Sequence, residues 1–187
     1  GAKLDQGLEA GTMVDIGGGS TELTSIKGGF DLAKTSIPQG SLSSFANYVA
    51  GLMPTQKEVN AIAQAFRELA EKEETDVYHC TQLYGIGGSI RSAAKLYGDL
   101  CNNGNRFNYL RPEHIDAILN RYAEDPNAFA HEALRTLPDR IHTLIPGCVI
   151  IREAFKLCGG ERLDICKYGV REGYLAERVL VKPVSFA

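Results

Sequence analysis

The stretch Asp15-Ile16-Gly17-Gly18-Gly19-Ser20-Thr21-Glu22-Leu23, residues 15–23, places three glycines and two hydroxyl residues between two acids. Thr12 to Ile16 predicts a short strand ending at these glycines, and Ser20 to Lys27 predicts its returning partner. The pair Gly28-Gly29 is typical of a tight hairpin loop, and it leads into a third expected strand around Asp31 to Ile37. We therefore expect three antiparallel strands at the start of the chain.

Two helices are predicted next. Pro38-Gln39-Gly40 ends the third strand, and Ser41 to Ala50 is expected to be helical. A longer helix runs from Thr55 to about Glu74, because Thr55 and Glu58 have the spacing of a capping box. Its apolar residues fall on one face at helical spacing; they are Val59, Ile62, Phe66 and Leu69.

A second strand, glycine turn and helix follow. A core strand is expected within Val77 to Ile86, ending in the turn Gly87-Gly88-Ser89. The next helix is predicted from Ile90 to Tyr97, with Gly98 as its stop. Backbone N–H groups and the dipole at the start of a helix favour an anion, so this turn is a second candidate phosphate site.

The remaining sequence predicts further helices and one more strand. Residues 102–137 are expected to form a helical insertion packed on the core. A long apolar helix follows, kinked or restarted at Pro146 and ended by Gly159-Gly160. A final strand is expected at Leu163 to Tyr168, and a last helix from about Arg171 to Leu180.

This order predicts an α/β fold, a mixed five-stranded sheet flanked by helices. It is similar to the ribonuclease-H-like half of the superfold that sugar kinases, actin and Hsp70 share. Residues 1–187 are expected to form a single domain, with residues 1–10 as a tail. Because one architecture serves many chemistries, function must come from the site residues.

Composition limits the partners. The 187 residues carry a net charge of −3, so no overall basic field exists to hold DNA or an anionic membrane surface, and a polyanion must be bound locally. No apolar stretch reaches the ~20 residues of a membrane helix, and the start has no signal-peptide pattern. We expect a cytoplasmic protein. Because the chain begins Gly1-Ala2 without a methionine, we also expect it to be a fragment.

Several other site classes are disfavoured. The five cysteines are odd in number and form no C-x-x-C pair, which argues against a disulfide framework and a structural zinc site. The four histidines show no metal-ligand spacing, and we assign them no role. There is no G-x-S-x-G, Walker loop or G-x-G-x-x-G after a strand, so the common hydrolase, P-loop and dinucleotide sites are not indicated.

The first glycine stretch has the residue types of a phosphate site. Glycines allow close backbone approach to a phosphoryl group and turn N–H donors toward it, and Ser20 and Thr21 can add hydroxyl donors. The carboxylates of Asp15 and Glu22 repel phosphate, so we expect them to hold Mg²⁺ or the attacking water. The alternative is a solvated glycine-rich hairpin turn that lies between two acids by chance.

Other segments are weaker candidates. Arg140, just before the long apolar helix, can clamp phosphate through forked hydrogen bonds, or it is an ordinary surface residue. Residues 38–41 and 168–175 each look like a turn that opens a helix, and we interpret both as structural. The residues expected to bind phosphate are Gly17, Gly18, Gly19, Ser20, Thr21, Gly87, Gly88, Ser89 and Arg140.

Four segments taken in order resemble the Ppx/GppA family of exopolyphosphatases and guanosine pentaphosphate phosphohydrolases. They are Val14 to Leu23, Ser36 to Ser41, Gly85 to Ser89 and Gly169 to Gly173, and the resemblance extends from about Gly11 to Leu180. It implies an actin-like two-domain core in which water removes a terminal phosphate from a phosphate chain in the cleft, with Mg²⁺ neutralising charge.

The resemblance also implies residue roles. Asp15 and Glu22 match the family's acidic positions, Gly17 to Ser20 match its phosphate loop, Gly87-Gly88 match its second glycine turn, and Arg140 falls near a substrate-binding arginine. The family's first domain carries another phosphate loop and the glutamate thought to activate water. We expect that domain, upstream of this chain, to be its partner, so this chain alone should be nearly inactive and the intact protein active.

Two other functions remain open. Another member of the superfold, such as a sugar kinase or Hsp70-like ATPase, would bind adenosine at the second glycine turn. A non-catalytic module would instead sense a phosphorylated nucleotide such as guanosine tetraphosphate or pentaphosphate, or dock a partner. The sequence does not separate polyphosphate from guanosine pentaphosphate as substrate, and it leaves the oligomeric state open, a homodimer included.

Overall fold

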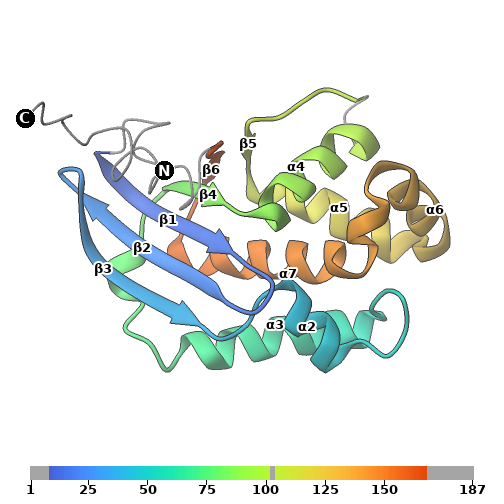
Figure 1. Cartoon of the computed structure of the whole chain (residues 1–187), viewed down its shortest axis with the longest axis horizontal. Coiled ribbons are helices and arrows are strands. Elements are labelled where there is room, and N and C mark those ends of the chain that lie inside the picture. Colours follow the sequence, from blue (N-terminus) through green and yellow to red (C-terminus); the bar gives the residue numbers. More distant parts are fainter. Residues whose placement is uncertain (1–8, 102–103, 168–187) are drawn as a thin grey trace, which may run out of the picture.

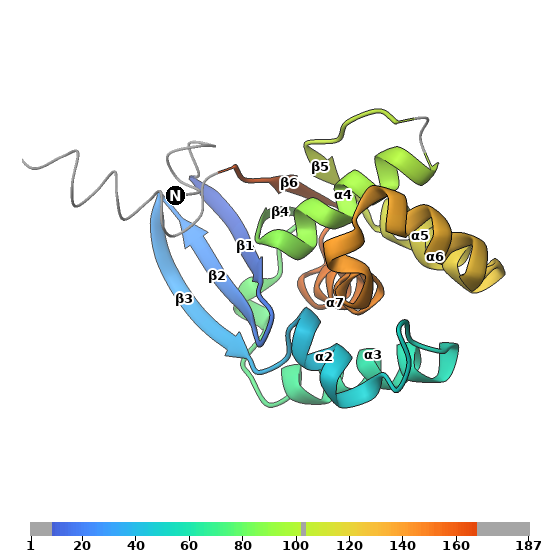
Figure 2. The same ribbon diagram turned by 45° about the vertical axis from the view of Figure 1, so that its right-hand side comes forward.

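A computed structural model describes residues 9–101 and 104–167 of the chain. A strongly curved sheet lies on one side and most of the helices lie on the other (Figures 1 and 2). The six strands are ordered β3-β2-β1-β4-β6-β5. They span Ala10–Ile16 (β1), Thr21–Lys27 (β2), Phe30–Ile37 (β3), Gln82–Ile86 (β4), Tyr109–Leu110 (β5) and Arg162–Ile165 (β6).

The sheet is mixed, as predicted. The first three strands are antiparallel neighbours, whereas β4 runs parallel to both β1 and β6, and β5 is antiparallel to β6. The predicted α/β class with a mixed sheet flanked by helices is confirmed. The sixth strand, β5, was not expected, because two residues are too short to give a strand pattern in the sequence.

The helices are α2 (Ser41–Tyr48), α3 (Gln56–Ala70), α4 (Gly88–Cys101), α5 (Pro112–Glu124), α6 (Pro126–Thr136) and α7 (Ile141–Cys158), with short 3-10 turns at Asp76–Tyr78 and Pro138–Arg140. No described helix is both long enough and apolar enough to cross a membrane. The predicted helix from about Arg171 to Leu180 and the candidate segment 168–175 lie outside the described residues.

The capping box of α3 is confirmed. The Thr55 N–H donates to a carboxylate oxygen of Glu58 at 2.7 Å, and the Glu58 N–H donates to the Thr55 hydroxyl. The helix ends at Ala70, earlier than the predicted Glu74. The residues after Ala70 are charged and exposed, so continuing the helix would bury no further apolar surface.

The helix stop expected at Gly98 is wrong, and of the kink or restart expected at Pro146 the restart is wrong. Helix α4 continues past Gly98 to Cys101; a Cβ atom on Gly98 would collide with the carbonyl oxygen of Asn105, so close packing explains this glycine. Helix α7 does not restart at Pro146, which lies inside one continuous helix. The predicted stop of α7 is confirmed, because Gly159 adopts a left-handed conformation with φ 63°.

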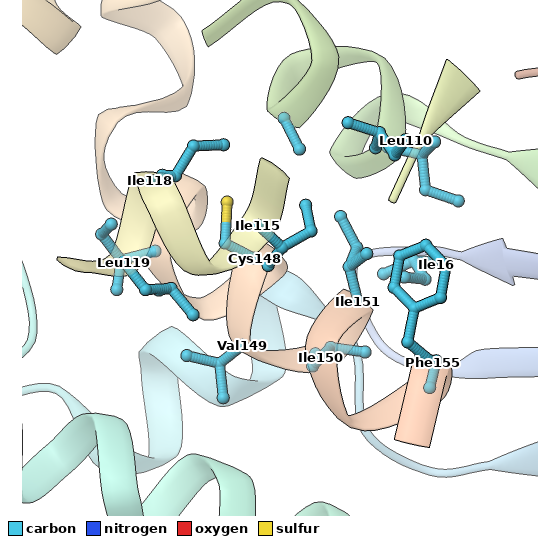
Figure 3. Close-up of a cluster of buried hydrophobic side chains, with 14 of the residues drawn as sticks. Ile16, Leu110, Ile115, Ile118, Leu119, Cys148, Val149, Ile150, Ile151 and Phe155 are labelled. Atoms are coloured by element: carbon cyan, nitrogen blue, oxygen red, sulfur yellow. The ribbon is translucent and has the colours of Figure 1, made fainter. Parts of the chain in front are cut away.

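Helix α7 forms the centre of the core. It packs against α2, α3, α4, α5 and β1, which explains why it is buried on nearly every side. The cluster drawn in Figure 3 joins α7 to β1, β5 and α5; its labelled members are Ile16, Leu110, Ile115, Ile118, Leu119, Cys148, Val149, Ile150, Ile151 and Phe155. Each such aliphatic or aromatic side chain contributes about 1.5–3 kcal/mol on burial. Helix α7 is thereby fixed relative to β1.

Candidate functional site

The carboxyl ends of β1 and β4 lie side by side. The two strands are parallel, with Asp15 opposite Ile86, so the turn after each strand emerges at the same edge of the sheet. A Cβ atom on Gly87, whose φ is +108°, would lie 2.7 Å from the carbonyl oxygen of Ile16. This edge is where open α/β sheets bind their ligands.

A cavity of about 410 Å³ lies between the two turns. Its lining residues are Asp15, Ile16, Gly17, Gly18, Ser41, Leu42, Gly87, Gly88, Ser89, Asp139, Arg140, His142 and Thr143. The structure therefore brings together most of the candidate residues, which come from three distant parts of the sequence. Four candidates are not in this lining, namely Gly19, Ser20, Thr21 and Glu22.

The first glycine loop is held by the N-terminus of α2. The Ser41 N–H donates to the Gly17 carbonyl at 3.0 Å. The N–H groups of Leu42 and Ser43 donate to the Gly18 carbonyl at 2.9 and 2.8 Å. The first N–H groups of α2 are therefore already bonded within the protein. The Gly17 and Gly18 carbonyls point toward α2, and across a trans peptide the N–H points opposite to the C=O. The N–H groups of Gly18 and Gly19, which share these peptides, therefore point away from α2. The loop thus presents backbone donors suited to an anion.

A hydrogen-bonded chain links the two turns. The Ser89 hydroxyl donates to the Ser41 hydroxyl at 3.1 Å, which in turn donates to the Gly17 carbonyl at 3.3 Å. Both serines are buried. A Cβ atom on Gly40 would lie 2.6 Å from the Gly17 carbonyl oxygen, so only glycine permits this approach. The contacts give Gly40 and Ser41 a structural role, and Ser41 in addition lines the cavity.

Arg140 lies over the start of α4. An added Cβ atom on Gly88 would be 2.7 Å from one terminal nitrogen of the Arg140 guanidinium. Arg140 belongs to the turn Pro138–Arg140 that precedes α7, and it forms no ion pair with any described residue. A guanidinium beside backbone N–H donors is a suitable clamp for phosphate oxygens.

The two acids of the glycine stretch face each other across neighbouring strands. Asp15 pairs with Glu22 in the β1–β2 register. Burial raises the pKa of Asp15 above its ordinary value, the charge of Glu22 raises it further, and Arg91 opposes both effects. The hydroxyls of Ser20 and Ser36 donate to the same carboxylate oxygen of Glu22. The Glu22 carboxylate is therefore held in place beside the loop.

Thr21 is placed differently from the other hydroxyl residues. Its side chain is fully buried, and its hydroxyl donates to the Gln39 carbonyl at 2.8 Å. Gln39 is itself buried and donates to the Ser44 hydroxyl and the Ile62 carbonyl. Thr21 thus supports the segment that carries Gly40 and lies away from the cavity lining.

The oxygen ligands near the loop fit Mg²⁺ better than a transition metal. The described residues contain no cluster of three or more histidine, cysteine or acidic side chains able to hold a metal ion. Mg²⁺ commonly takes only one or two carboxylates and completes its shell with water and phosphate oxygens. Asp15 and Glu22 supply such a pair, and a cation between them would offset the repulsion that raises the pKa of Asp15.

Sequence reasoning missed six residues of the cavity, namely Ile16, Ser41, Leu42, Asp139, His142 and Thr143. The His142 ring centre lies 5.3 Å from that of Phe45, which fixes the start of α7 against α2. The signal in the sequence was closeness to Arg140 for Asp139, His142 and Thr143, and closeness to the turns at residues 17–19 and 38–41 for the others. No spacing rule shows that the start of α7 folds against two glycine turns so far upstream.

Comparisons with protein families and with solved structures both point to the same family. The family model described as the Ppx/GppA phosphatase family matches residues 6–182, and no curated protein sequence matches. The crystal structure of the Aquifex aeolicus Ppx/GppA family member is 25% identical with a TM-score of 0.75, over 94% of this chain and 58% of that one. An exopolyphosphatase from Cytophaga hutchinsonii ATCC 33406 is 17% identical with a TM-score of 0.72, over 89% and 56%. The chain thus spans less than two thirds of these structures.

Proposed function

Because the chain belongs to the Ppx/GppA phosphatase family, we propose that the intact protein hydrolyses the terminal phosphoanhydride bond of inorganic polyphosphate or of guanosine pentaphosphate. One observation supports this proposal above the others. The glycine loop after β1, the glycine turn after β4 and the Arg140 guanidinium meet at a single cavity. Such a convergence of donors from separate segments is what a phosphoryl group requires.

Each part of the site has a proposed role. The N–H groups of Gly18 and Gly19 and the Arg140 guanidinium bind the terminal phosphate and stabilise the charge that develops on its oxygens. Asp15 and Glu22 hold Mg²⁺, which when bound neutralises further phosphate charge. The buried serines Ser41 and Ser89 keep the two turns at a fixed separation. Phosphoryl transfer depends mainly on this kind of positioning and electrostatic stabilisation.

We propose that the general base comes from a first domain outside this chain. The described site residues include Asp15 and Glu22, which are proposed to hold the cation, so neither is free to take a proton from water. The chain covers 58% of the Aquifex aeolicus structure, which leaves room in that structure for such a domain. This chain alone is then expected to bind phosphate compounds and to release phosphate very slowly.

Phosphate release is the direct test. It should be measured with Mg²⁺ on polyphosphate and guanosine pentaphosphate, using this chain and a version extended upstream to a two-domain core. We expect release by the extended protein alone, and its loss in Asp15→Ala. Asp116→Ala, which removes an exposed acid from α5, is the matched control and should retain full activity.

Other outcomes point to other functions. Binding of guanosine pentaphosphate without any phosphate release by the extended protein would support the sensor function and exclude the hydrolase. Tight binding of Mg-ATP without binding of polyphosphate would support a kinase or ATPase of the same superfold. Equal activity of Asp15→Ala and Asp116→Ala would remove Asp15 from the site.

A further inference from the structure

Two cysteines lie close together at the end of α7 that is opposite to Arg140. All five cysteines of the chain are free thiols. Cys158 is the last residue of α7, and Cys80 lies just before β4. The Cys80 N–H donates to the Cys158 carbonyl at 2.7 Å. The fold thus brings these two cysteines side by side, although they are far apart in the sequence.

The backbone contact places Cys80 and Cys158 within disulfide range. The Cα atom of Cys80 is one bond from the donor nitrogen, and the Cα atom of Cys158 is two bonds from the acceptor oxygen. With standard bond lengths and a hydrogen bond of 2.7 Å, the two Cα atoms are at most about 6.6 Å apart. Disulfides usually join Cα atoms that are roughly 4.4–6.8 Å apart. The backbone separation found here therefore suits a disulfide.

Neighbouring contacts hold the two segments together. The Glu161 N–H donates to the Thr81 carbonyl at 2.8 Å, and the parallel pairing of β4 with β6 continues from there. A Cβ atom on Gly159 would collide with the imidazole of His79, so that ring packs directly against the backbone next to Cys158. The two cysteines are therefore positioned by paired backbone on both segments.

The two thiols differ in exposure and therefore in reactivity. Cys80 is partly exposed, whereas the side chain of Cys158 is fully buried. Burial, and after it the charge of Cys80, raises the pKa of Cys158 to about 12. The second of these causes places the two sulfur atoms within electrostatic range of each other. Because the thiolate is the reactive form and Cys158 is shielded from solvent, an oxidant in solution meets Cys80 first.

We propose that Cys80 and Cys158 form a reversible disulfide when the protein meets hydrogen peroxide. The Cys80 sulfur attacks one peroxide oxygen, the O–O bond breaks, and Cys80 becomes a sulfenic acid with release of water. The Cys158 sulfur then attacks the Cys80 sulfur; the S–O bond breaks, the S–S bond forms, and the hydroxyl leaves with the Cys158 proton as a second water. A thiol reductant restores both thiols by exchange. The cross-link joins the end of α7 to the segment that enters β4 and so locks the native fold.

Peptide mapping and thermal unfolding after treatment with hydrogen peroxide test the proposal. The remaining thiols are alkylated, the chain is digested, and cross-linked fragments are identified by mass without reduction. Wild-type chain should yield a fragment that joins Cys80 to Cys158. Its melting temperature should rise by about 5–10 °C, because the cross-link restricts a long loop of the unfolded chain. Dithiothreitol should reverse both changes.

Three variants separate the roles of the cysteines. Cys80→Ser should show neither the cross-link nor the rise in melting temperature. In Cys158→Ala the sulfenic acid on Cys80 should persist and be trapped by dimedone, a readout that does not depend on the stability of the variant. Cys101→Ser is the matched control, because Cys101 is also a partly exposed free thiol, and it should behave as wild type. The proposal is overturned if peroxide links Cys80 to another cysteine or to a second chain, oxidises it without any cross-link, or raises the melting temperature of Cys80→Ser equally.

Discussion

The backbone of Gly40 contacts the carbonyl oxygen of Gly17 so closely that a Cβ atom on Gly40 would lie 2.6 Å from it. Gly40 immediately precedes α2, whose first N–H groups bind the carbonyls of the glycine loop. The loop that faces the cavity is thus shaped by Gly40, which is not among the residues that line the cavity. Residues behind the loop should therefore control binding as strongly as residues in front of it.

Gly40→Ala tests this relationship. The added methyl group meets backbone atoms that cannot rotate away, so the loop must shift and its N–H donors with it. We expect a loss of about 1–3 kcal/mol in the free energy of unfolding and about tenfold weaker tripolyphosphate binding. Calorimetry and thermal unfolding measure the two effects. Gly51→Ala, where the nearest atom would be 3.7 Å away, should change neither, and equal effects in both variants would contradict the prediction.

Gly88→Ala should act through Arg140. The added Cβ atom would come within 2.7 Å of the guanidinium, which can swing aside because it is the end of a flexible side chain. Stability should change little, whereas tripolyphosphate affinity should fall about tenfold because a charged hydrogen-bond donor leaves its position. In an Arg140→Ala background Gly88→Ala should cause no further loss. Additive losses in this double-mutant cycle would show that Gly88 acts independently of Arg140.

Asp15→Asn should stabilise the protein at neutral pH while removing its activity. Burial and then Glu22 raise the pKa of Asp15 above its ordinary value of 3.8, so the charged form is disfavoured in the folded state. The stability from this group is fully present below the ordinary pKa and is lost as the pH rises through the folded pKa. The melting temperature of Asp15→Asn should therefore exceed that of wild type at pH 7 and converge with it in acid. A lower melting temperature at neutral pH would contradict this, and Asp116→Asn serves as the exposed control.

Glu153→Gln should destabilise the protein at neutral pH. Glu153 on α7 is almost fully buried and contacts Arg67, Arg152 and Lys156. Burial alone would raise its pKa, but hydrogen bonds and charge from Lys156 and Arg67 hold it below the ordinary value of 4.5. The stability is therefore present above that value and is lost as the pH falls through the folded pKa.

The expected loss for Glu153→Gln is on the order of 2 kcal/mol at pH 7, measured by urea unfolding across the pH range. The difference from wild type should shrink in acid. Glu132→Gln, which breaks an exposed pair with Arg121, should cost less because solvent screens such pairs. A pH-independent loss in Glu153→Gln would show that shape rather than charge matters at this position.

Local signals predicted the parts of the fold that depend on neighbours in sequence. The hairpin strands, the capping box of Thr55 and the glycine stop at Gly159 all follow from short-range rules that the structure obeys. The stop at Gly98 was wrong because Asn105 approaches that glycine from the following loop. A glycine kept for packing cannot be distinguished in one sequence from a glycine that ends a helix.

The sequence predicted which residue types form the candidate site, but it did not predict which partners their side chains contact. The glycine turns and Arg140 were identified from composition and from resemblance, and their shared cavity needed the structure. Ser20 and Thr21 were expected to donate to phosphate, yet their hydroxyls donate to Glu22 and to the Gln39 carbonyl. Hydroxyl groups accept many partners, so the sequence does not determine which one is chosen. The assignment of phosphate and metal binding to these residues stays a prediction.

The parallel pairing of β1 with β4 has a consequence for folding kinetics. The hairpin of β1 and β2 joins residues that are close in sequence and can form within microseconds. Pairing of β1 with β4 must wait until α2 and α3 have crossed between them, since distant segments close slowly. The cavity is therefore complete only once this late pairing has formed, and ligands that bind it stabilise the native state alone. Bound phosphate would then report, during refolding, the moment at which β1 and β4 pair.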